Sequence, residues 1–455
     1  SGEIGKRGVL DVLRRGIHHG PAKVELYFAT PSPQNTNAAA LHAQNRFTVT
    51  RQLRYSKDSG RLALDLGLCI NGLPLATFEL KNRLTKQNVG DALEQYQRDR
   101  DPGERLFQFG RCMAHFAVDD QEVRFCTELK GKDSWFLPFN KGWQDGAGNP
   151  PNPLGLKTDY LWREVLCRPG LIEIVEHFAR IVEEKDEDTG RKRRKQIFPR
   201  WHKRDAVHRL LERVEQDGVG HRYLVQHSAG SGKSNTIAWT AHRLTELETD
   251  GGEPLFHSVI VVTDRILLDR QIRDSIRQFV QVPSIVAHAA HSAELKRGIE
   301  AGTRIIVTTV QKFPVIVREI GSLHRGRRFA ILIDEAHSSQ GGRAATKMNM
   351  ALSESGEFAE GLDLEDAVNL LIASGRMLPN ASYFAFTATP KPKTLEVFGE
   401  RFEQGGEVRF RPHHAYSMKQ AIEEGFIVDV LAHYTPVQSF YRLATTLEDD
   451  DPEFD

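Results

Sequence analysis

The sequence predicts an α/β protein built from two successive domains, each with its own core. Residues 61–81 alternate between apolar and polar side chains, the pattern of two strands that each bury one face. After residue 220, apolar runs such as Val259–Val262 alternate with helical stretches, which predicts a parallel sheet with crossover helices. The chain has 455 residues, enough for about three domains. The two patterns therefore belong to separate cores.

Composition excludes several classes of protein. No run of 18 apolar residues occurs, so a membrane span is excluded. The four cysteines lie far apart with no C-x-x-C pair, which argues against a zinc site or a disulfide framework and predicts a cytoplasmic protein. Sixty-one basic residues balance 61 acidic ones, so any nucleic-acid binding requires a local basic patch.

A charged stretch, Glu183–Lys195, carries no apolar side chain and predicts a solvated linker. Its basic half, Arg191–Lys195, could contact phosphates, although charge runs are more often simply exposed. Asn140–Pro153, rich in Gly and Pro, predicts a long surface connection. We therefore expect a first domain at 1–180, a charged linker at 181–197, a second domain at 198–430 and the start of a further connection at 431–455.

Parity decides the register of the hairpin in the first domain. Both strands bury even-numbered residues, so the numbers of paired residues must add to an even sum. A two-residue Asn71-Gly72 turn would pair 70 with 73 and give an odd sum. We therefore predict an odd-length loop, with a bulge, that pairs 70 with 74 and places Asp65 opposite Glu79.

This register gathers Asp65, Glu79 and Lys81 on one face of the hairpin and predicts a magnesium-dependent nuclease site. Two neighbouring carboxylates repel each other, and Mg²⁺ relieves that repulsion as their shared ligand. The metal can activate water and stabilise charge on a phosphodiester, while Lys81 orients or deprotonates the water. The arrangement is that of PD-(D/E)xK nucleases. The alternative is a hairpin with one wet, charged face.

The second domain carries a phosphate-binding loop. Tyr223–Val225 predicts a short strand, which leads into a loop and a helix that opens near Ser234. Glycines let backbone N–H groups approach phosphate, the lysine reaches the β- and γ-phosphates, and the serine ligates Mg²⁺. The residues assigned to nucleotide binding here are Gly230, Ser231, Gly232, Lys233 and Ser234. The general pattern has glycine at the position of His227.

Two later strand ends complete the predicted ATPase. An apolar strand at Phe329–Ile333 runs into Asp334, which can hold the Mg²⁺ shell, and Glu335, which can polarise water. We place His337 beside them in the nucleotide site. A strand at Tyr383–Phe386 leads into Thr387 and Thr389, which can sense the nucleotide state. Two non-functional alternatives exist. The acids could simply end a buried strand, and the threonines could only cap the next helix.

The motifs GSGKS, DEAH and TATP, in this order and spacing, resemble the first RecA-like domain of a superfamily 2 helicase or translocase. More specifically, the chain resembles the restriction (motor) subunit of type I restriction–modification enzymes. The segments that carry this resemblance are INGLPLATFELKN (70–82), HSAGSGKSNTIAW (227–239), VVTDRILLDRQ (261–271), VTTVQKF (307–313), DEAHSSQ (334–340), FTATP (386–390) and YSMKQAIEEGFIVD (416–429).

The resemblance implies ATP-driven translocation along double-stranded DNA and cleavage away from the recognition site. It makes Asp65 and Glu79 metal ligands and Lys81 the catalytic lysine, and it adds Gln95 on the following helix. It also implies partner methylation and specificity subunits, with S-adenosylmethionine bound to the methylation subunit.

The chain departs from the family pattern in a few places. Asp99 stands where many members have a tyrosine, Ser338 where they have arginine, and Lys203 where an adenine-reading glutamine is common. We expect a piece of a longer subunit, cut at both ends, whose second RecA-like domain would follow. Two alternatives remain: a superfamily 2 helicase whose amino-terminal domain only binds DNA, and a degenerate scaffold that docks partners. The intact charged motifs argue against the scaffold.

Overall fold

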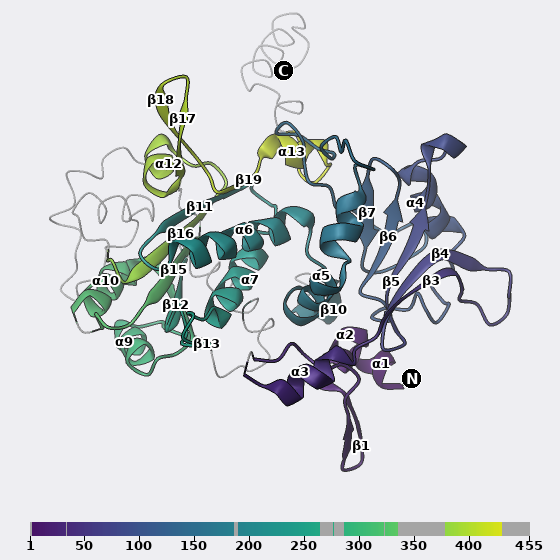
Figure 1. Ribbon diagram of the computed structural model, residues 1–455, viewed down its shortest axis with the longest axis horizontal. Helices are drawn as coiled ribbons and strands as arrows, with labels where there is room; N and C mark the ends of the chain where they lie inside the picture. The colour runs from purple at the N-terminus through teal and green to yellow at the C-terminus, as the bar shows by residue number, and fades with distance from the viewer. Residues whose placement is uncertain are drawn as a thin grey trace, which may run out of the picture.

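The computed structural model describes residues 2–32, 34–185, 190–263, 276, 286–322, 324–334 and 378–429. Two large sheets, one of six strands and one of seven, dominate this part of the chain. In Figure 1 they lie on opposite sides of the molecule, with the helices α5, α6 and α7 between them. The predicted α/β class, with a parallel second sheet, is confirmed.

The first sheet has the strand order β3-β4-β5-β6-β7-β8. Its strands are β3 (Phe47–Arg54), β4 (Ala63–Ile70), β5 (Leu73–Leu80), β6 (Ala114–Val118), β7 (Val123–Cys126) and β8 (Leu137–Pro138). Only β5 and β6 pair in parallel; the other neighbours are antiparallel.

Helices cover both faces of this sheet. One face carries Phe78 and Phe116 and packs on α2 (Val9–Arg15), α5 (Arg168–Glu173) and the short helix η3 (Ile174–Phe178). The other face lies under α4 (Val89–Arg98). The smaller elements around it are α1 (Gly2–Arg7), β1 (Ile17–His19), β2 (Ala22–Val24), α3 (Thr36–Ala43), η1 (Arg83–Thr85) and η2 (Leu161–Val165).

The hairpin of β4 and β5 has the predicted even pairing sum but not the predicted loop. Ile70 pairs with Leu73 across a two-residue Asn71-Gly72 turn, so the odd-length loop was wrong. The left-handed φ values of Asn71 (50°) and Gly72 (79°) explain why this dipeptide forms the tight turn. A register shift after Leu68 then restores the even sum, because Leu66 pairs with Phe78. The expected bulge therefore corrects the register within the strands.

The second sheet is wholly parallel, in the order β13-β14-β12-β15-β16-β11-β19. Its strands are β13 (Val286–His288), β14 (Ile305–Thr309), β12 (Ser258–Thr263), β15 (Phe329–Asp334), β16 (Ala381–Thr387), β11 (Arg222–His227) and β19 (His414–Tyr416). The β-branched, apolar sequences of these strands suit a sheet that is buried on both faces.

Helices cover both faces of the parallel sheet as well. On one face lie α6 (Trp201–Asp217) and α7 (Lys233–Glu246). On the other lie α9 (Ser292–Glu300), η5 (Val310–Lys312), α10 (Phe313–Ser322) and α12 (Pro392–Phe398). An outlying hairpin, β17 (Glu400–Gln404) with β18 (Glu407–Arg411), follows, and α13 (Met418–Glu423) closes the described part.

The stretch predicted as a solvated linker is instead an antiparallel hairpin of β9 (Arg180–Lys185) and β10 (Lys192–Ile197). The hairpin is anchored to the segment just before β6, because the buried Gln196 amide donates hydrogen bonds to the carbonyl oxygens of Cys112 (2.7 Å) and Met113 (2.9 Å). The sequence carries no alternation over these strands; only Ile181, Val182 and Ile197, at the two ends, are apolar. The segment predicted at 431–455 lies outside the described residues.

The two halves of the chain meet at α13. Glu423 accepts a hydrogen bond from the backbone N–H of Ala147 (2.7 Å), and the Ser417 hydroxyl donates to the Asp145 carbonyl oxygen (3.1 Å). Asp145 and Ala147 belong to the long connection predicted at 140–153. Among the described residues, no helix is long and apolar enough to cross a membrane.

Candidate functional site

Asp65 lies on β4 at the point where its ladder with β5 opens. One carboxylate oxygen accepts a hydrogen bond from the backbone N–H of Leu80 at 2.8 Å, and the other accepts one from the Gln52 amide at 3.3 Å. Gln52 has a left-handed φ of 49° and falls between the paired residues of β3. Asp65 remains partly exposed. The backbone of β5 and the Gln52 side chain of β3 therefore fix this carboxylate without burying it.

Glu79 is nearly fully buried, at 1% exposure, and forms an ion pair with Arg100. Both Nε and Nη2 of Arg100 approach the same carboxylate oxygen of Glu79, at 2.7 and 2.6 Å. Burial raises the pKa of Glu79 to about 7, the Arg100 guanidinium opposes that rise, and the Asp65 carboxylate adds to it. The sequence analysis missed Arg100, because no motif or spacing marks a residue in the loop that follows α4.

Lys81 is held by the helix that covers its face of the hairpin. Its ammonium group donates a 2.7 Å hydrogen bond to the side-chain oxygen of Gln95 on α4. Asp99, at the position of the family tyrosine, is the C-cap residue of α4. Tyr96 is fully buried, with its hydroxyl 2.8 Å from the Thr77 hydroxyl. Glu79 is therefore buried beneath this face of the hairpin, whereas Asp65 and Lys81 remain partly exposed.

The two carboxylates suit Mg²⁺, which binds through one or two carboxylates and keeps several waters. Within the described ranges, no group of three or more His, Cys, Asp or Glu side chains could hold a metal ion. The residues of this hairpin that could hold Mg²⁺ are Asp65 and Glu79, with water completing the shell.

The phosphate loop joins β11 to α7, which begins at Lys233. Gly230 and Gly232 adopt positive φ values of 72° and 79°, which glycine alone reaches without strain. Gly232 is the N-cap residue of α7, so the first N–H groups of that helix face the loop. This geometry matches a polyphosphate anion at a helix N-terminus.

Buried hydroxyls around the loop support the same conclusion. Ser228, Ser231 and Thr236 are each at most 1% exposed. Their side-chain oxygens have no hydrogen-bond partner among the described residues. Unpartnered buried hydroxyls are costly, and a bound nucleotide with its metal and water shell would supply the missing partners. The residues present therefore fit a nucleotide.

Asp334 and Thr387 end two neighbouring strands at the carboxyl edge of the parallel sheet. Thr387 is also level with Gln226 of β11, one residue before the strand end that feeds the phosphate loop. Ligands bind at this edge of open parallel sheets. Thr389 is exposed in the turn that follows. The predicted residues Glu335 and His337 lie outside the described part of the chain.

His227, the departure from the glycine pattern, is the last residue of β11 and is fully buried. Its Nε2 lies 3.0 Å from Nδ1 of His414, whose other ring nitrogen lies 3.3 Å from the carboxylate of Asp205. Burial lowers the pKa of His227 well below its usual value. At the position where the general phosphate-loop pattern has glycine, this chain therefore has an uncharged histidine that is packed inside the domain.

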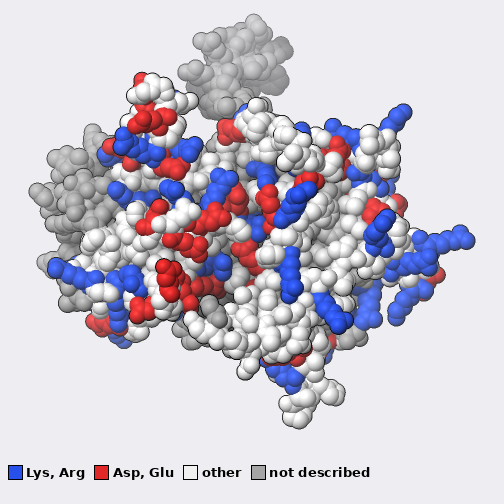
Figure 2. All heavy atoms as spheres, in the orientation of Figure 1, with Lys and Arg blue, Asp and Glu red and all other residues white. Residues whose placement is uncertain are grey.

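Basic side chains gather near the nuclease hairpin. Figure 2 shows Lys and Arg projecting where Figure 1 places the loop between β3 and β4. The exposed members there are Arg51, Arg54, Lys57 and Arg61, which we call the β3–β4 basic patch. Such a patch is the local charge that DNA binding by a neutral chain requires.

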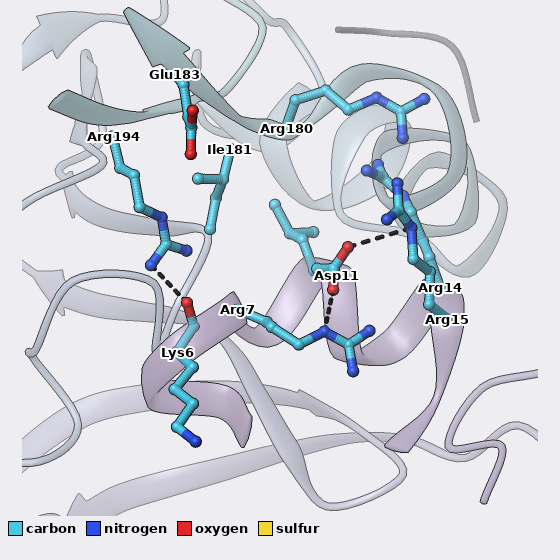
Figure 3. Close-up of a pocket in the computed structure, with 10 residues that line it drawn as sticks. Lys6, Arg7, Asp11, Arg14, Arg15, Arg180, Ile181, Glu183 and Arg194 are labelled. Atoms are coloured by element: carbon cyan, nitrogen blue, oxygen red, sulfur yellow. Dashed lines mark hydrogen bonds and ion pairs between the residues drawn. The ribbon is translucent and has the colours of Figure 1, made fainter. Parts of the chain in front are cut away.

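A second basic region surrounds a cavity of about 410 Å³ between α1–α2 and the β9–β10 hairpin (Figure 3). Its basic lining residues are Lys6, Arg7, Arg14, Arg15, Arg180 and Arg194. Arg14 donates to the carbonyl oxygens of Val175 (2.6 Å) and Ala179 (2.5 Å), at the end of η3. Arg194 donates to the carbonyl oxygen of Lys6 at 2.6 Å. Arg14 therefore joins α2 to η3, and Arg194 joins the β9–β10 hairpin to α1.

The first domain thus places carboxylates and a lysine on a helix-covered hairpin, and the second joins a phosphate loop to a parallel sheet. Residues 9–134 match the family model described as the type I restriction enzyme R protein N terminus. Residues 202–360 match the SWI2/SNF2 ATPase model. The chain is therefore related to the endonuclease (R) subunits of type I restriction enzymes, as the sequence predicted.

Curated relatives agree with this relationship. An endonuclease subunit of a type I restriction enzyme from Staphylococcus aureus strain COL is 25% identical over 418 residues, which is 90% of this chain and 38% of the relative. The HindI endonuclease subunit of Haemophilus influenzae is 26% identical, over 85% of this chain and 34% of the relative. The chain thus spans a little over a third of the length of these relatives.

Among solved structures, the UvsW helicase from bacteriophage T4 is similar at 15% identity and a TM-score of 0.29, covering 48% of this chain and 61% of that chain.

Proposed function

We propose that this chain carries the endonuclease and ATP-dependent motor functions of a type I restriction enzyme. The observation that carries the proposal is the presence, in one chain, of two arrangements: Asp65, Glu79 and Lys81 on the hairpin beside α4, and the phosphate loop at the carboxyl edge of a parallel sheet. The family matches and the curated relatives support the same combination.

In the nuclease site, Asp65 and Glu79 would hold Mg²⁺ beside the scissile phosphodiester of double-stranded DNA. The bound ion would activate water and stabilise the charge that develops on the phosphate. Lys81 would orient the attacking water or remove its proton. Gln95 fixes the lysine ammonium through its 2.7 Å hydrogen bond, so Lys81 is held on the same face as both carboxylates. The β3–β4 basic patch lies at the neighbouring strands and would contact the DNA backbone.

In the motor site, the glycines at 230 and 232 and the N-terminus of α7 would bind the phosphates of ATP. Lys233 would contact the β- and γ-phosphates, while Ser234 and Asp334 would hold the nucleotide's Mg²⁺. Glu335 would polarise the attacking water, and Thr387 with Thr389 would report the nucleotide state to bound DNA. The resulting cycle of hydrolysis would drive translocation along the duplex.

The relatives named as type I restriction enzyme subunits lead us to propose methylation and specificity subunits as partners, with S-adenosylmethionine bound to the methylation subunit. Target recognition would then come from those partners. The four cysteines are free thiols, which agrees with the proposed cytoplasmic location.

One competing function is a superfamily 2 helicase whose amino-terminal domain only binds DNA. The side chains converging on Lys81 and the two carboxylates favour cleavage over simple binding. The deciding experiment assembles the full-length subunit, with Asp65 or with Asp65→Ala, with its methylation and specificity partners. ATP-dependent cleavage of plasmid DNA by the parent assembly, and its loss in the variant, are expected. A parent assembly that hydrolyses ATP but leaves the plasmid intact would favour the competing function, whereas cleavage that persists in the variant would contradict the role given to Asp65.

A further inference from the structure

Lys203 is a buried lysine next to the phosphate loop, at the position where the family pattern has an adenine-reading glutamine. It lies in the first turn of α6 and is only 7% exposed. A Cβ atom placed on Gly232 would lie 2.5 Å from Nζ of Lys203. The ammonium group therefore lies directly over the glycine that caps α7.

The surroundings of this ammonium group carry positive rather than negative charge. The two charged groups that act most on Lys203 are Arg200, the N-cap residue of the same helix, and Lys195, on β10; both disfavour its protonated form. Arg200 is itself paired with Glu424, and Lys195 with Glu184. No carboxylate forms an ion pair with Lys203 anywhere in the described part of the chain. A buried cation without an acidic partner is costly, so proteins retain one mainly where a ligand supplies the opposite charge.

We propose that Lys203 is a second phosphate-binding lysine of the nucleotide site, which contacts the polyphosphate chain from the side opposite α7. This inference rests on the proposed ATP binding and adds a residue to it. Gly232 belongs to the loop proposed to bind the phosphates, and Nζ of Lys203 is the side-chain atom placed next to it from α6. Burial lowers the pKa of Lys203 to about 7, and an arriving phosphate would favour its charged form.

The hydrogen-bonding chemistry of lysine also distinguishes phosphate binding from recognition of the adenine base. An ammonium group only donates hydrogen bonds, whereas a glutamine amide both donates and accepts. Lysine therefore cannot accept from the 6-amino group of adenine, and its charge suits the phosphates that ATP and GTP share.

The test compares the full chain with Lys203→Met, Lys203→Arg and Lys203→Gln variants. Binding of ATP, GTP and inorganic pyrophosphate is measured in the presence of Mg²⁺. Loss of a charge-assisted contact should weaken all three ligands by about 10- to 100-fold in Lys203→Met, and Lys203→Arg should retain part of the affinity. Unequal losses for ATP and GTP, or a Lys203→Gln variant that gains selectivity for ATP, would assign the residue to the base and overturn the proposal.

Lys312 offers a matched control. It is also buried, at 8% exposure, but its ammonium donates to the Thr309 hydroxyl at 3.1 Å on β14, four strands away from β11. Lys312→Met should leave nucleotide affinity unchanged.

Thermal unfolding of the nucleotide-free chain separates ligand binding from a structural role. If Lys203 is kept for the ligand, Lys203→Met should melt at a higher temperature than the parent, because an uncompensated buried charge is removed. A lower melting temperature would show that Lys203 stabilises the phosphate loop itself and would contradict the proposal. A parent chain that binds no nucleotide, with Lys233→Ala indistinguishable from it, would instead contradict the proposed function from which this inference starts.

Discussion

Glu79 and Arg100 form a buried ion pair, with two guanidinium nitrogens 2.6 and 2.7 Å from one carboxylate oxygen, inside the candidate nuclease site. The pair holds in place a carboxylate that burial would otherwise drive toward its protonated form. Both contacts use the same oxygen, so the pair leaves the other carboxylate oxygen of Glu79 without a contact from Arg100. Arg100 therefore belongs to the positioning of the site, although it carries none of the proposed chemistry.

Removal of Arg100 should destabilise the chain in a pH-dependent way. In Arg100→Met, Glu79 stays buried without its partner, which costs about 3–5 kcal/mol while the carboxylate is ionised. The folded-state pKa of Glu79 should rise further above its unfolded value. The folded chain then binds more protons than the unfolded chain, so stability falls as the pH rises through that window.

The measurement is thermal unfolding of the parent and of Arg100→Met at pH 5.5 and pH 8. The melting temperature of the variant should fall further below that of the parent at pH 8 than at pH 5.5. Adding Glu79→Gln to Arg100→Met should recover much of the loss, because neither member of the pair is then charged. A deficit that is equal at both pH values would show that Arg100 acts through packing alone.

Alanine at Asp65, Glu79 or Lys81 should abolish DNA cleavage by the reconstituted enzyme. The expected loss is at least about 10²–10³-fold, the scale of removing one preorganised electrostatic contact. ATP hydrolysis by the same assembly should be unaffected, because the phosphate loop lies in the other sheet. Gln95→Ala should reduce cleavage less, since it frees the Lys81 ammonium without removing it. Parallel losses of cleavage and ATP hydrolysis would mean that the two sites are not separate.

Duplex DNA binding should depend on local basic groups, because the net charge is zero. Each phosphate contact contributes about −0.9 to the slope of log affinity against log salt. Neutralising Arg51 and Arg54 in the β3–β4 basic patch should remove one or two phosphate contacts. The slope should then become shallower by about 0.9 to 1.8.

Neutralising residues 191–195 of the β9–β10 hairpin is the informative comparison. Arg194 is engaged with the Lys6 carbonyl oxygen, and Lys192 and Lys195 pair with glutamates across the hairpin. We therefore expect a smaller change in slope than at the basic patch. The opposite ranking would make the hairpin the main DNA contact.

Sequence patterns anticipated β4 and β5 of the first sheet and β11, β12, β15 and β16 of the second, because alternation and strand-end motifs are local signals. The remaining strands are short or lack a clear pattern, and they were not predicted. The loop length at Asn71-Gly72 was wrong because two local rules conflicted: turn chemistry favoured two residues, whereas the buried faces required an even sum. The structure satisfies both by placing the bulge inside the strands. Arg100 and the buried setting of Lys203 could not be predicted, since each depends on contacts between segments far apart in the sequence.

Nucleotide affinity should depend on pH through Lys203. Its pKa is lowered to about 7, first by burial and then by Arg200 and Lys195, so the free chain loses this charge as the pH rises above 7. Burial lowers the pKa of His202 and His227 well below the usual range, so these neighbours stay neutral over the same window. If bound phosphate keeps Lys203 protonated, binding takes up a proton, and ATP affinity should fall by up to about tenfold per pH unit between pH 7.5 and 9.5.

The same residue fixes the sign of the stability change. Between pH 7 and 10.5 the unfolded chain binds the Lys203 proton and the folded, nucleotide-free chain does not, so this group makes stability rise with pH. The melting-temperature advantage of Lys203→Met should therefore be largest at or below pH 7 and should shrink toward pH 10. In Lys203→Arg the guanidinium stays charged, so the pH dependence of ATP binding above 7.5 should disappear. Titration calorimetry in two buffers of different ionisation enthalpy counts the proton taken up, and an unchanged proton count in Lys203→Met would assign the titration to another group.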